Sequence, residues 1–166
     1  ILGRKKPGDY TPQAILKGYE ALISGFYPPD RVLLASLSTA GRYAGPREAL
    51  YHALVRKNYG CTHIVIGRDH AGVGTYYDKY ASQQLCKKYE KKLAIKILAF
   101  GTPLYCQLCD GIVTDQTCPH TQTDPDSITY VNGTDIRATI NRGELPEPYL
   151  MRPEIIRSLE KVPLFT

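Results

Sequence analysis

Apolar residues recur with two different spacings that alternate along the first hundred residues. Three segments carry an apolar residue every three or four positions, which is the spacing of an amphipathic helix. Between them lie three short, continuous apolar runs of the kind that form buried strands. The predicted order is a helix from Thr11-Pro12 to Gly25, a strand over 32–37, a helix over 46–59, a strand over 62–66, a helix over 78–93 and a strand over 95–100.

Strands that alternate with helices of this length predict βαβ units. The predicted fold class is therefore α/β, with a parallel sheet and helices on both of its faces. The pattern changes after residue 100, where a Cys-rich loop is followed by a short strand over 128–131 and helices over 135–141 and 153–162. We expect three parts: a partial α/β unit at 1–100, a metal-binding loop at 101–126, and a C-terminal strand and helical segment at 127–166.

Composition excludes several classes of protein. Hydrophobic residues make up 43% of the chain and charged residues 22%, which favours a globular domain over a disordered one. The apolar runs are too short to span a bilayer, and no export signal begins the chain, so we expect a cytoplasmic protein without a membrane partner. The net charge of +5 is modest, and the densest basic run, 87–92, includes Glu90. A solvated helix face is favoured there over a nucleic-acid site.

A glycine-rich segment, Gly67-Arg68-Asp69-His70-Ala71-Gly72-Val73-Gly74, follows the strand over 62–66. Ligands of parallel α/β sheets bind beyond the carboxyl ends of the strands, and glycines let backbone N–H groups approach them. Arg68 suits phosphate or sulfate oxygens, Asp69 suits ribose hydroxyls, and His70 suits a nucleotide. From spacing alone, a simple turn in which Asp69 and Arg68 pair with each other is equally well supported, because the segment is neither a P-loop nor a dinucleotide fingerprint.

The turn over 39–48 follows the first predicted strand and occupies an equivalent place. Arg47 falls in the first helical turn, where the helix dipole disfavours a cation. Such an arginine faces an anion or a carboxylate, and a structural ion pair is the favoured interpretation. Arg42, flanked by small residues, is the better ligand candidate.

Five cysteines are present, and three of them cluster with a histidine as Cys106-x2-Cys109-x8-Cys118-x-His120. These are the ligand types of a structural zinc site, although the spacing is not a common zinc-finger spacing. A redox pair or free buried thiols are the alternatives. The remaining cysteines, Cys61 and Cys86, are predicted to be small core residues, and His52 and His63 to be core or surface histidines.

A further helix start lies at Asn132–Arg137, with Thr134 as the predicted N-cap. A capped packing helix is favoured there, and Arg137 pointing to the anion site is the alternative.

Taken in order, these segments resemble ATP sulfurylase (sulfate adenylyltransferase) in its prokaryotic, zinc-containing form. The resemblance covers essentially the whole chain, and the segment from Gly67 to Gly74 is its most specific part. The matching segments are 42–49, 52–60, 67–74, Thr117-Cys118-Pro119-His120, Gly133-Thr134-Asp135-Ile136-Arg137 and Arg152-Pro153-Glu154.

The resemblance implies a nucleotidyltransferase fold of Rossmann-like type and a role in sulfur metabolism. ATP and sulfate would give adenosine 5′-phosphosulfate and pyrophosphate, or the reverse, with the physiological direction open. It also implies structural Zn2+ and Mg2+ that enters with ATP. In this resemblance Arg68 would be the catalytic residue and would bind sulfate together with the Ala71 N–H. Gly67, Asp69 and His70 would contact the nucleotide, and the backbone of Val113 would contact adenine. The zinc ligands would be Cys106, Cys109, Cys118 and His120.

Several positions depart from that family's pattern. Gly41 replaces a Met, Asn132 replaces a Ser, and 121–124 replaces a second histidine, so that His120 becomes the fourth zinc ligand. The four histidines include no His-x-x-His pair. We therefore expect the C-terminal part of a catalytic unit that needs its N-terminal half, which is on another chain, removed or absent. The expected partner is that N-terminal half or a second copy of the chain in a homo-oligomer. The alternative is a non-catalytic adenine-nucleotide- and zinc-binding module.

Overall fold

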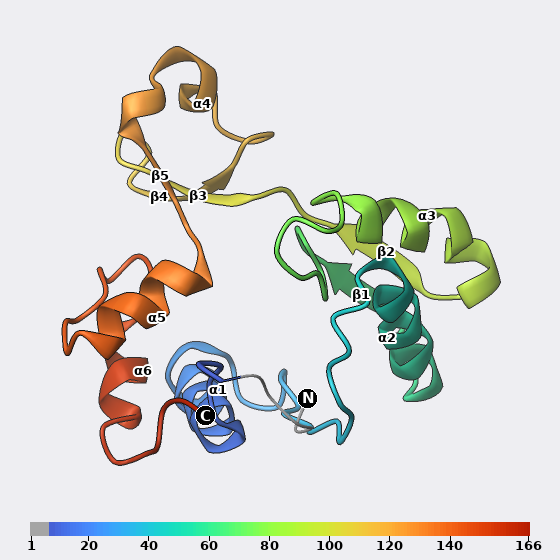
Figure 1. Cartoon of the computed structure of the whole chain (residues 1–166), viewed down its shortest axis with the longest axis horizontal. Coiled ribbons are helices and arrows are strands. Elements are labelled where there is room, and N and C mark those ends of the chain that lie inside the picture. Colours follow the sequence, from blue (N-terminus) through green and yellow to red (C-terminus); the bar gives the residue numbers. More distant parts are fainter. Residues whose placement is uncertain (1–6) are drawn as a thin grey trace. The chain divides into compact units, whose positions relative to one another are not determined.

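A computed structural model describes residues 7–166, which form two compact units (Figure 1). One unit contains residues up to 41 together with 130–166, and the other contains 42–129. The predicted three-part division at residues 100 and 126 follows sequence pattern rather than contacts, and it stays a prediction. In chain order the elements are α1 (Pro12–Phe26), α2 (Pro46–Asn58), β1 (His63–Ile66), α3 (Ala81–Leu93), β2 (Lys96–Ala99), β3 (Pro103–Cys106), β4 (Gly111–Thr114), α4 (His120–Thr123), the 3-10 helix η1 (Pro125–Ser127), β5 (Ile128–Tyr130), α5 (Gly133–Asn141) and α6 (Pro153–Ser158).

The unit over 42–129 is built on a parallel pair of strands. β1 pairs with β2 in parallel, with His63 opposite Lys96 and Ile66 opposite Ala99. α3 connects the two strands, so β1, α3 and β2 form the predicted βαβ unit. Because the strands are parallel, their carboxyl ends lie at one edge, next to the segment that begins at Gly67.

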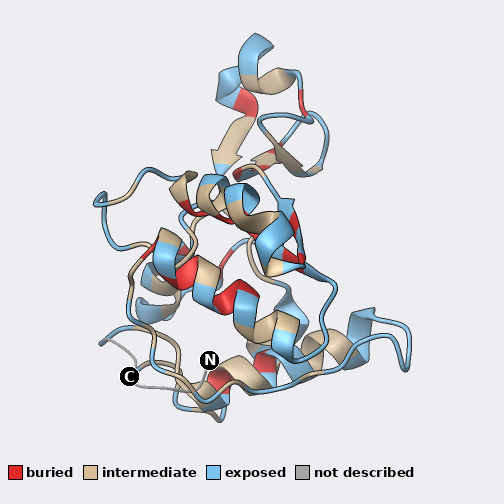
Figure 2. Cartoon of the chain, turned by 90° about the vertical axis from the view of Figure 1, so that its right-hand side faces the viewer, coloured by how far each residue is buried: buried red, intermediate tan, exposed pale blue. Residues whose placement is uncertain are grey.

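The core of this unit lies on one face of the sheet. Ile64 and Ile66 of β1 and Ile97 of β2 are buried with residues of both α2 and α3, and those two helices pack against each other. Buried positions recur along the helices between exposed ones (Figure 2). Val65 points to the other face and is 52% exposed. The prediction of helices on both faces is therefore wrong for the described residues. Residues alternate between the faces of a strand, and both helices cover the same one.

The predicted first strand, 32–37, is also wrong. No residue of this segment belongs to a strand, and Leu33 is 90% exposed. A strand needs a neighbour to accept and donate its backbone hydrogen bonds. No described strand pairs with 32–37, so the apolar run alone does not form one.

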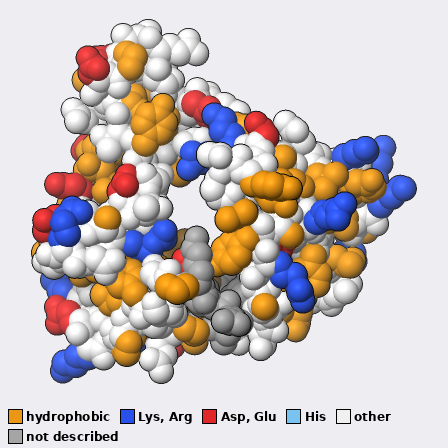
Figure 3. Space-filling model, in the orientation of Figure 1, with side chains coloured by type: hydrophobic (Ala, Val, Ile, Leu, Met, Phe, Trp, Pro, Cys, Tyr) orange, Lys and Arg blue, Asp and Glu red, His pale blue; other side chains and the backbone are white. Residues whose placement is uncertain are grey.

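A carboxylate joins the end of α3 to the neighbouring strand β2. Glu90 accepts the N–H of Ile97 at 3.0 Å and contacts the ammonium groups of Lys87 at 3.2 Å and Lys96 at 3.3 Å. The hydrogen bond from Ile97, followed by that from Lys87, lowers the pKa of Glu90 to about 2. The other lysines of the run 87–92 are exposed, and Lys and Arg side chains gather around α3 (Figure 3), as expected for a solvated helix face.

The Cys-rich segment forms a small sheet of three strands in the order β4-β3-β5. β3 and β4 are antiparallel, with Cys106 opposite Gly111, so the predicted loop contains a hairpin. A Cβ atom at Gly101 would lie 2.7 Å from Oδ1 of the exposed Asp115, whose side chain would have to move aside.

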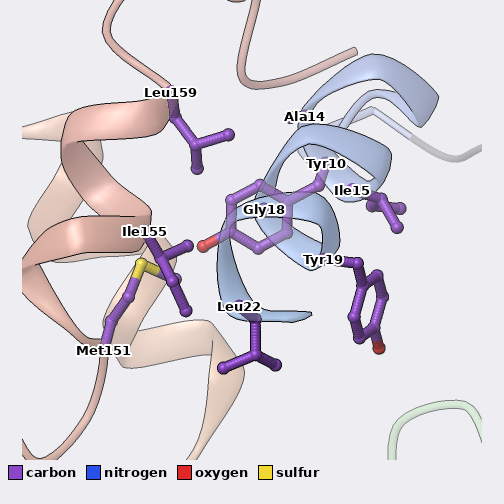
Figure 4. Close-up of a pocket in the computed structure, with 9 residues that line it drawn as sticks. All are labelled: Tyr10, Ala14, Ile15, Gly18, Tyr19, Leu22, Met151, Ile155 and Leu159. Atoms are coloured by element: carbon purple, nitrogen blue, oxygen red, sulfur yellow. The ribbon is translucent and has the colours of Figure 1, made fainter. Parts of the chain in front are cut away.

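The unit over residues up to 41 and 130–166 is helical. Thr11 caps α1 by accepting the N–H of Ala14 at 3.1 Å, as predicted. α1 packs against α6 around an apolar pocket of about 340 Å³, into which Leu22, Met151 and Ile155 project (Figure 4). α5 begins with Asn132 rather than Thr134 as its N-cap, because the Asn132 amide oxygen accepts the N–H groups of Thr134 and Asp135.

Among the described residues, no helix combines the length and the apolar character needed to cross a bilayer.

We predict that Glu90→Gln lowers the melting temperature by a few degrees at neutral pH. The pKa of Glu90 is depressed from 4.5 to about 2, so its stabilisation is complete above pH 4.5 and is lost as the pH falls towards 2. Melting curves recorded by circular dichroism between pH 7 and pH 2.5 test this. The difference from the wild type should shrink below pH 4.5.

Glu20→Gln is the matched control. Glu20 lies 3.9 Å from Lys17 in an exposed helical pair, and such pairs contribute little to stability. An equal loss in both variants, or a loss in Glu90→Gln that does not change with pH, would contradict the role assigned to Glu90.

Candidate functional site

The segment from Gly67 leaves the carboxyl end of β1, as predicted. The side-chain amide of Gln83 on α3 donates to the carbonyl oxygens of Ile66 at 3.0 Å and Phe100 at 2.7 Å. One side chain thus joins the ends of both parallel strands. The loop that follows β1 therefore starts at the edge of the sheet where Gln83 holds the two strand ends together.

The backbone of this loop is strained. Asp69 and Ala71 have left-handed conformations, with φ of +51° and +58°. Such conformations of residues other than glycine cost about 1–3 kcal/mol each and cluster at functional sites. The Asp69 carboxylate lies over Gly72, where a Cβ atom would overlap it. This close approach depends on the missing Cβ atom of Gly72, whose N–H donates to the carbonyl oxygen of Asp69 at 3.1 Å and closes the turn.

Arg68 is exposed at the start of the loop. In the part of the chain that the structure describes, no carboxylate lies within ion-pairing distance of its guanidinium. The alternative in which Arg68 pairs with Asp69 is therefore wrong, because the Asp69 side chain turns back over Gly72 instead. The guanidinium keeps its donors for a ligand, and it suits the oxygens of sulfate or phosphate.

A second loop is attached to the first. The N–H of Gly45 donates to the carbonyl oxygen of Ala71 at 2.9 Å, and a Cβ atom at Gly45 would meet the ring of Tyr77 at 2.5 Å. Glu48, 6% exposed, accepts the N–H of Arg42 at 3.0 Å and that of Ala44 at 2.9 Å. A buried carboxylate thus shapes the turn before α2.

Of the two arginines in that turn, Arg47 differs from the prediction. Arg47 forms no ion pair with any described residue, so the structural ion pair favoured for it is absent there. The carboxylate next to it in sequence, Glu48, binds backbone N–H groups instead. Arg42 and Arg47 are both exposed.

Two histidines from different elements meet beneath the loop. Nδ1 of His52 on α2 lies 3.1 Å from Nε2 of His70, and Nε2 of His52 lies 3.6 Å from Oε1 of Glu48. Burial, and next the charge of Arg56, lowers the pKa of His52, while Glu48 opposes the change. Burial, and next His52, lowers the pKa of His70. His52 is buried, which is one of the two placements expected for it, and the sequence did not predict its contact with His70.

Val113, the residue that the resemblance assigns to adenine, lies in β4 opposite Leu104. It is partly buried. The hairpin that carries it starts beside α3, where the hydroxyls of Tyr80 and Thr102 are 3.1 Å apart. Its contact with adenine stays a prediction.

The predicted metal ligands do come together. The ligand atoms of Cys106, Cys109, Cys118 and His120 all lie within 4.8 Å of one another. Nδ1 of His120 lies 3.4 Å from Sγ of Cys106 and of Cys109, and 3.6 Å from Sγ of Cys118. The sulfur atoms of Cys109 and Cys118 are 3.8 Å apart, well beyond a disulfide bond.

These separations fit a tetrahedral zinc ion. Zinc bonds of about 2.3 Å to sulfur and about 2.0 Å to nitrogen place two tetrahedral sulfur ligands about 3.8 Å apart, and a sulfur and a nitrogen about 3.5 Å apart. The distances from Cys109 to Cys118 and from Cys109 to His120 agree with these values. His120 lies in one cluster with the three cysteines, and this cluster could hold a metal ion.

The two other cysteines lie outside this cluster. Cys86 is buried in the core as predicted, and burial raises its pKa to about 11. Cys61 was expected in the core too, but it is exposed, because it precedes β1 rather than lying in it.

Comparison with known proteins gives the family. A family model described as ATP-sulfurylase matches residues 1–162. A relative named sulfate adenylyltransferase from Cenarchaeum symbiosum is 44% identical over 98% of this chain and 42% of its own length. Relatives of the same name from Pyrococcus abyssi and Deinococcus radiodurans are 45% and 43% identical, over 96% and 97% of this chain and 42% and 41% of their own lengths. The chain thus spans about two fifths of the length of these relatives, and it belongs to the ATP-sulfurylase family.

We predict that the protein purifies with about one equivalent of zinc and that Cys109→Ser loses it. Metal bound by a folded site contributes to folding free energy, so the melting temperature should fall strongly as well. Metal analysis and thermal melting measure both effects.

Cys61→Ser is the matched control, since Cys61 is exposed and lies outside the cluster. It should keep both the metal and the melting temperature. A metal-free wild type that melts at the same temperature as the metal-loaded protein would overturn the assignment.

Proposed function

We propose that this member of the ATP-sulfurylase family supplies the sulfate- and nucleotide-binding part of a sulfate adenylyltransferase. The reaction joins the adenylyl group of ATP to sulfate and releases pyrophosphate, or runs in reverse. The observation that carries the proposal is the exposed guanidinium of Arg68, which forms no ion pair with a described residue, on a strained loop at the carboxyl end of β1.

Each residue of the loop has a proposed role. Arg68 and the N–H of Ala71 hold the sulfate, and Gly67, Asp69 and His70 contact the nucleotide. A sulfate oxygen attacks the α-phosphorus in line, while the bond from that phosphorus to the bridging oxygen breaks and pyrophosphate leaves with the electron pair. No covalent step on the protein is needed, so the loop acts by positioning and charge stabilisation. Mg2+ enters with ATP and neutralises phosphate charge.

The metal centre has a structural role in this proposal. Cys106 ends β3, and the metal ligands hold the hairpin in which Val113 is proposed to meet adenine. Zinc supplies rigidity there and no redox chemistry, since it has one stable oxidation state. A fixed hairpin limits the positions open to the adenine ring.

The chain acts with a further part. It spans about two fifths of its relatives and has no His-x-x-His pair, which the family uses at the phosphates. We propose that an N-terminal half supplies that pair, and that the chain works together with this half or in a homo-oligomer that includes it. The proposed setting is cytoplasmic sulfur metabolism.

We predict that Arg68→Ala weakens the binding of adenosine 5′-phosphosulfate at least tenfold without changing the fold. The variant loses charge-assisted hydrogen bonds to the sulfate group. Isothermal titration calorimetry measures the affinity, and circular dichroism checks the fold.

Lys91→Ala is the control, because it also removes one positive charge. Lys91 is exposed in the last turn of α3, which precedes β2 and so lies at the opposite edge of the parallel sheet. Its affinity should equal that of the wild type. Unchanged affinity in Arg68→Ala would remove the sulfate role.

We predict that the chain alone has no sulfate-dependent exchange between pyrophosphate and ATP, and that adding the N-terminal half of a relative restores it. A radiolabel exchange assay measures the activity, with the Arg68→Ala chain as the matched negative control. A verified complex without exchange would instead favour the non-catalytic nucleotide-binding module.

A further inference from the structure

Three side chains form a row that leads from the core of the larger unit to the candidate nucleotide loop. Glu48 and His52 lie one helical turn apart on α2, and His70 lies on the loop after β1. Resting on the proposed function, we propose that Glu48 and His52 hold His70 as the neutral Nε2–H tautomer. His70 then presents a bare Nδ1 to the nucleoside, as an acceptor for a hydroxyl or amino group and not as a donor to phosphate.

The row starts from the buried side chain of Glu48. Its two oxygens accept backbone N–H groups, one from Arg42 and one from Ala44. Hydrogen bonds donated to a carboxyl group favour its negative charge, and here two of them support that charge in a buried place. The nearest ring nitrogen, Nε2 of His52, faces this charge at 3.6 Å.

That charge sets the tautomer of His52. Its Nε2 atom is buried and has no hydrogen-bond partner among the described residues, and the Glu48 carboxylate faces it. A proton on Nε2 is attracted to the carboxylate, whereas a lone pair there would face negative charge across a buried gap. Because burial and Arg56 disfavour a doubly protonated ring, His52 carries its proton on Nε2 and leaves Nδ1 bare.

The bare Nδ1 of His52 in turn sets His70. Two nitrogens 3.1 Å apart need one proton between them, and His52 does not supply it. Nε2 of His70 therefore donates. Burial and the neighbouring His52 also hold His70 neutral, so its Nδ1 carries no proton. The main chain of His70 is fixed separately, because the hydroxyl of Ser82 donates to its carbonyl oxygen at 2.9 Å.

His52 is a positioning residue on this view, and it acts only through His70. A bare ring nitrogen repels the oxygens of phosphate and sulfate and attracts O–H or N–H groups. The ribose hydroxyls and the exocyclic amine are the donors that an adenine nucleotide offers. The oxyanions are thereby left to Arg68.

Nuclear magnetic resonance of nitrogen-15-labelled histidines tests the tautomer in the whole chain at neutral pH. We expect His70 and His52 each to show a protonated Nε2 and a bare Nδ1. A protonated Nδ1 on His70, or a doubly protonated His52, would overturn the proposal whether or not any nucleotide binds.

Binding of ATP to three variants tests whether His52 affects nucleotide binding through His70. His52→Leu fills the buried space without an acceptor and should weaken ATP about threefold to tenfold, as expected for one hydrogen bond. His52→Asn returns an amide oxygen as acceptor and should recover most of the affinity. His63→Leu is the matched control, because His63 is an exposed histidine whose ring nitrogen forms a hydrogen bond with the hydroxyl of Thr62. This variant should bind ATP as the wild type does.

ATP analogues identify the donor. The loss caused by His52→Leu should disappear with 2′-deoxy-ATP or 3′-deoxy-ATP if a ribose hydroxyl is the donor, and with inosine triphosphate if the amine is. An equal loss with all four nucleotides would show a general packing defect and overturn the proposal. If His52→Leu fails to fold, the tautomer measurement is made on His52→Asn and Glu48→Gln as well as on the wild type. Glu48→Gln should abolish the single tautomer of His52.

Different results would contradict the proposed function and the inference about the histidines. A wild-type chain with the expected tautomers that binds no ATP would contradict the proposed function and leave the histidine arrangement standing. A chain that binds ATP with His70 protonated on Nδ1 would contradict the inference and leave the proposed function standing.

Discussion

A buried carboxylate holds the candidate site together. Glu48 accepts N–H groups from the turn before α2 and faces His52, which contacts His70 on the loop after β1. Burying a charge is costly unless hydrogen bonds compensate it, and here two backbone donors do so. Two loops that are distant in sequence are thereby tied to one helix. The strained conformation of Asp69 and Ala71 depends on such bracing, because an isolated loop would relax.

The Cys and His cluster is a second feature on which our proposal depends. Its four residues come from the end of β3, the turn after β3, the segment between β4 and α4, and the start of α4. A small sheet of three short strands buries little apolar surface, so a metal ion held by these residues would contribute folding free energy that a small core lacks. Neighbouring groups support the ligands: the hydroxyl of Ser127 lies 4.0 Å from Sγ of Cys106, and its carbonyl oxygen accepts the N–H of Gln107.

Sequence patterns located most helices and the parallel strand pair, because their signals are local. Thr11-Pro12 began α1 as expected, and the periodicity of 46–59 matched α2. The pattern failed at 32–37, where an apolar run without a partner strand stays irregular. The prediction that helices cover both faces of the sheet also failed, since α2 and α3 lie on one side of β1 and β2.

The sequence by itself determined the family, the Cys and His ligand types and the loop that starts at Gly67, because these depend on which residues occur and at what spacing. The tertiary structure alone decided which groups meet. His52 and His70 lie eighteen positions apart and come into contact only because α2 packs beside β1. It also left Arg68 without a carboxylate partner among the described residues, because Asp69 turns back over Gly72. Contacts of this kind follow from packing between elements, and no local pattern of residues encodes them.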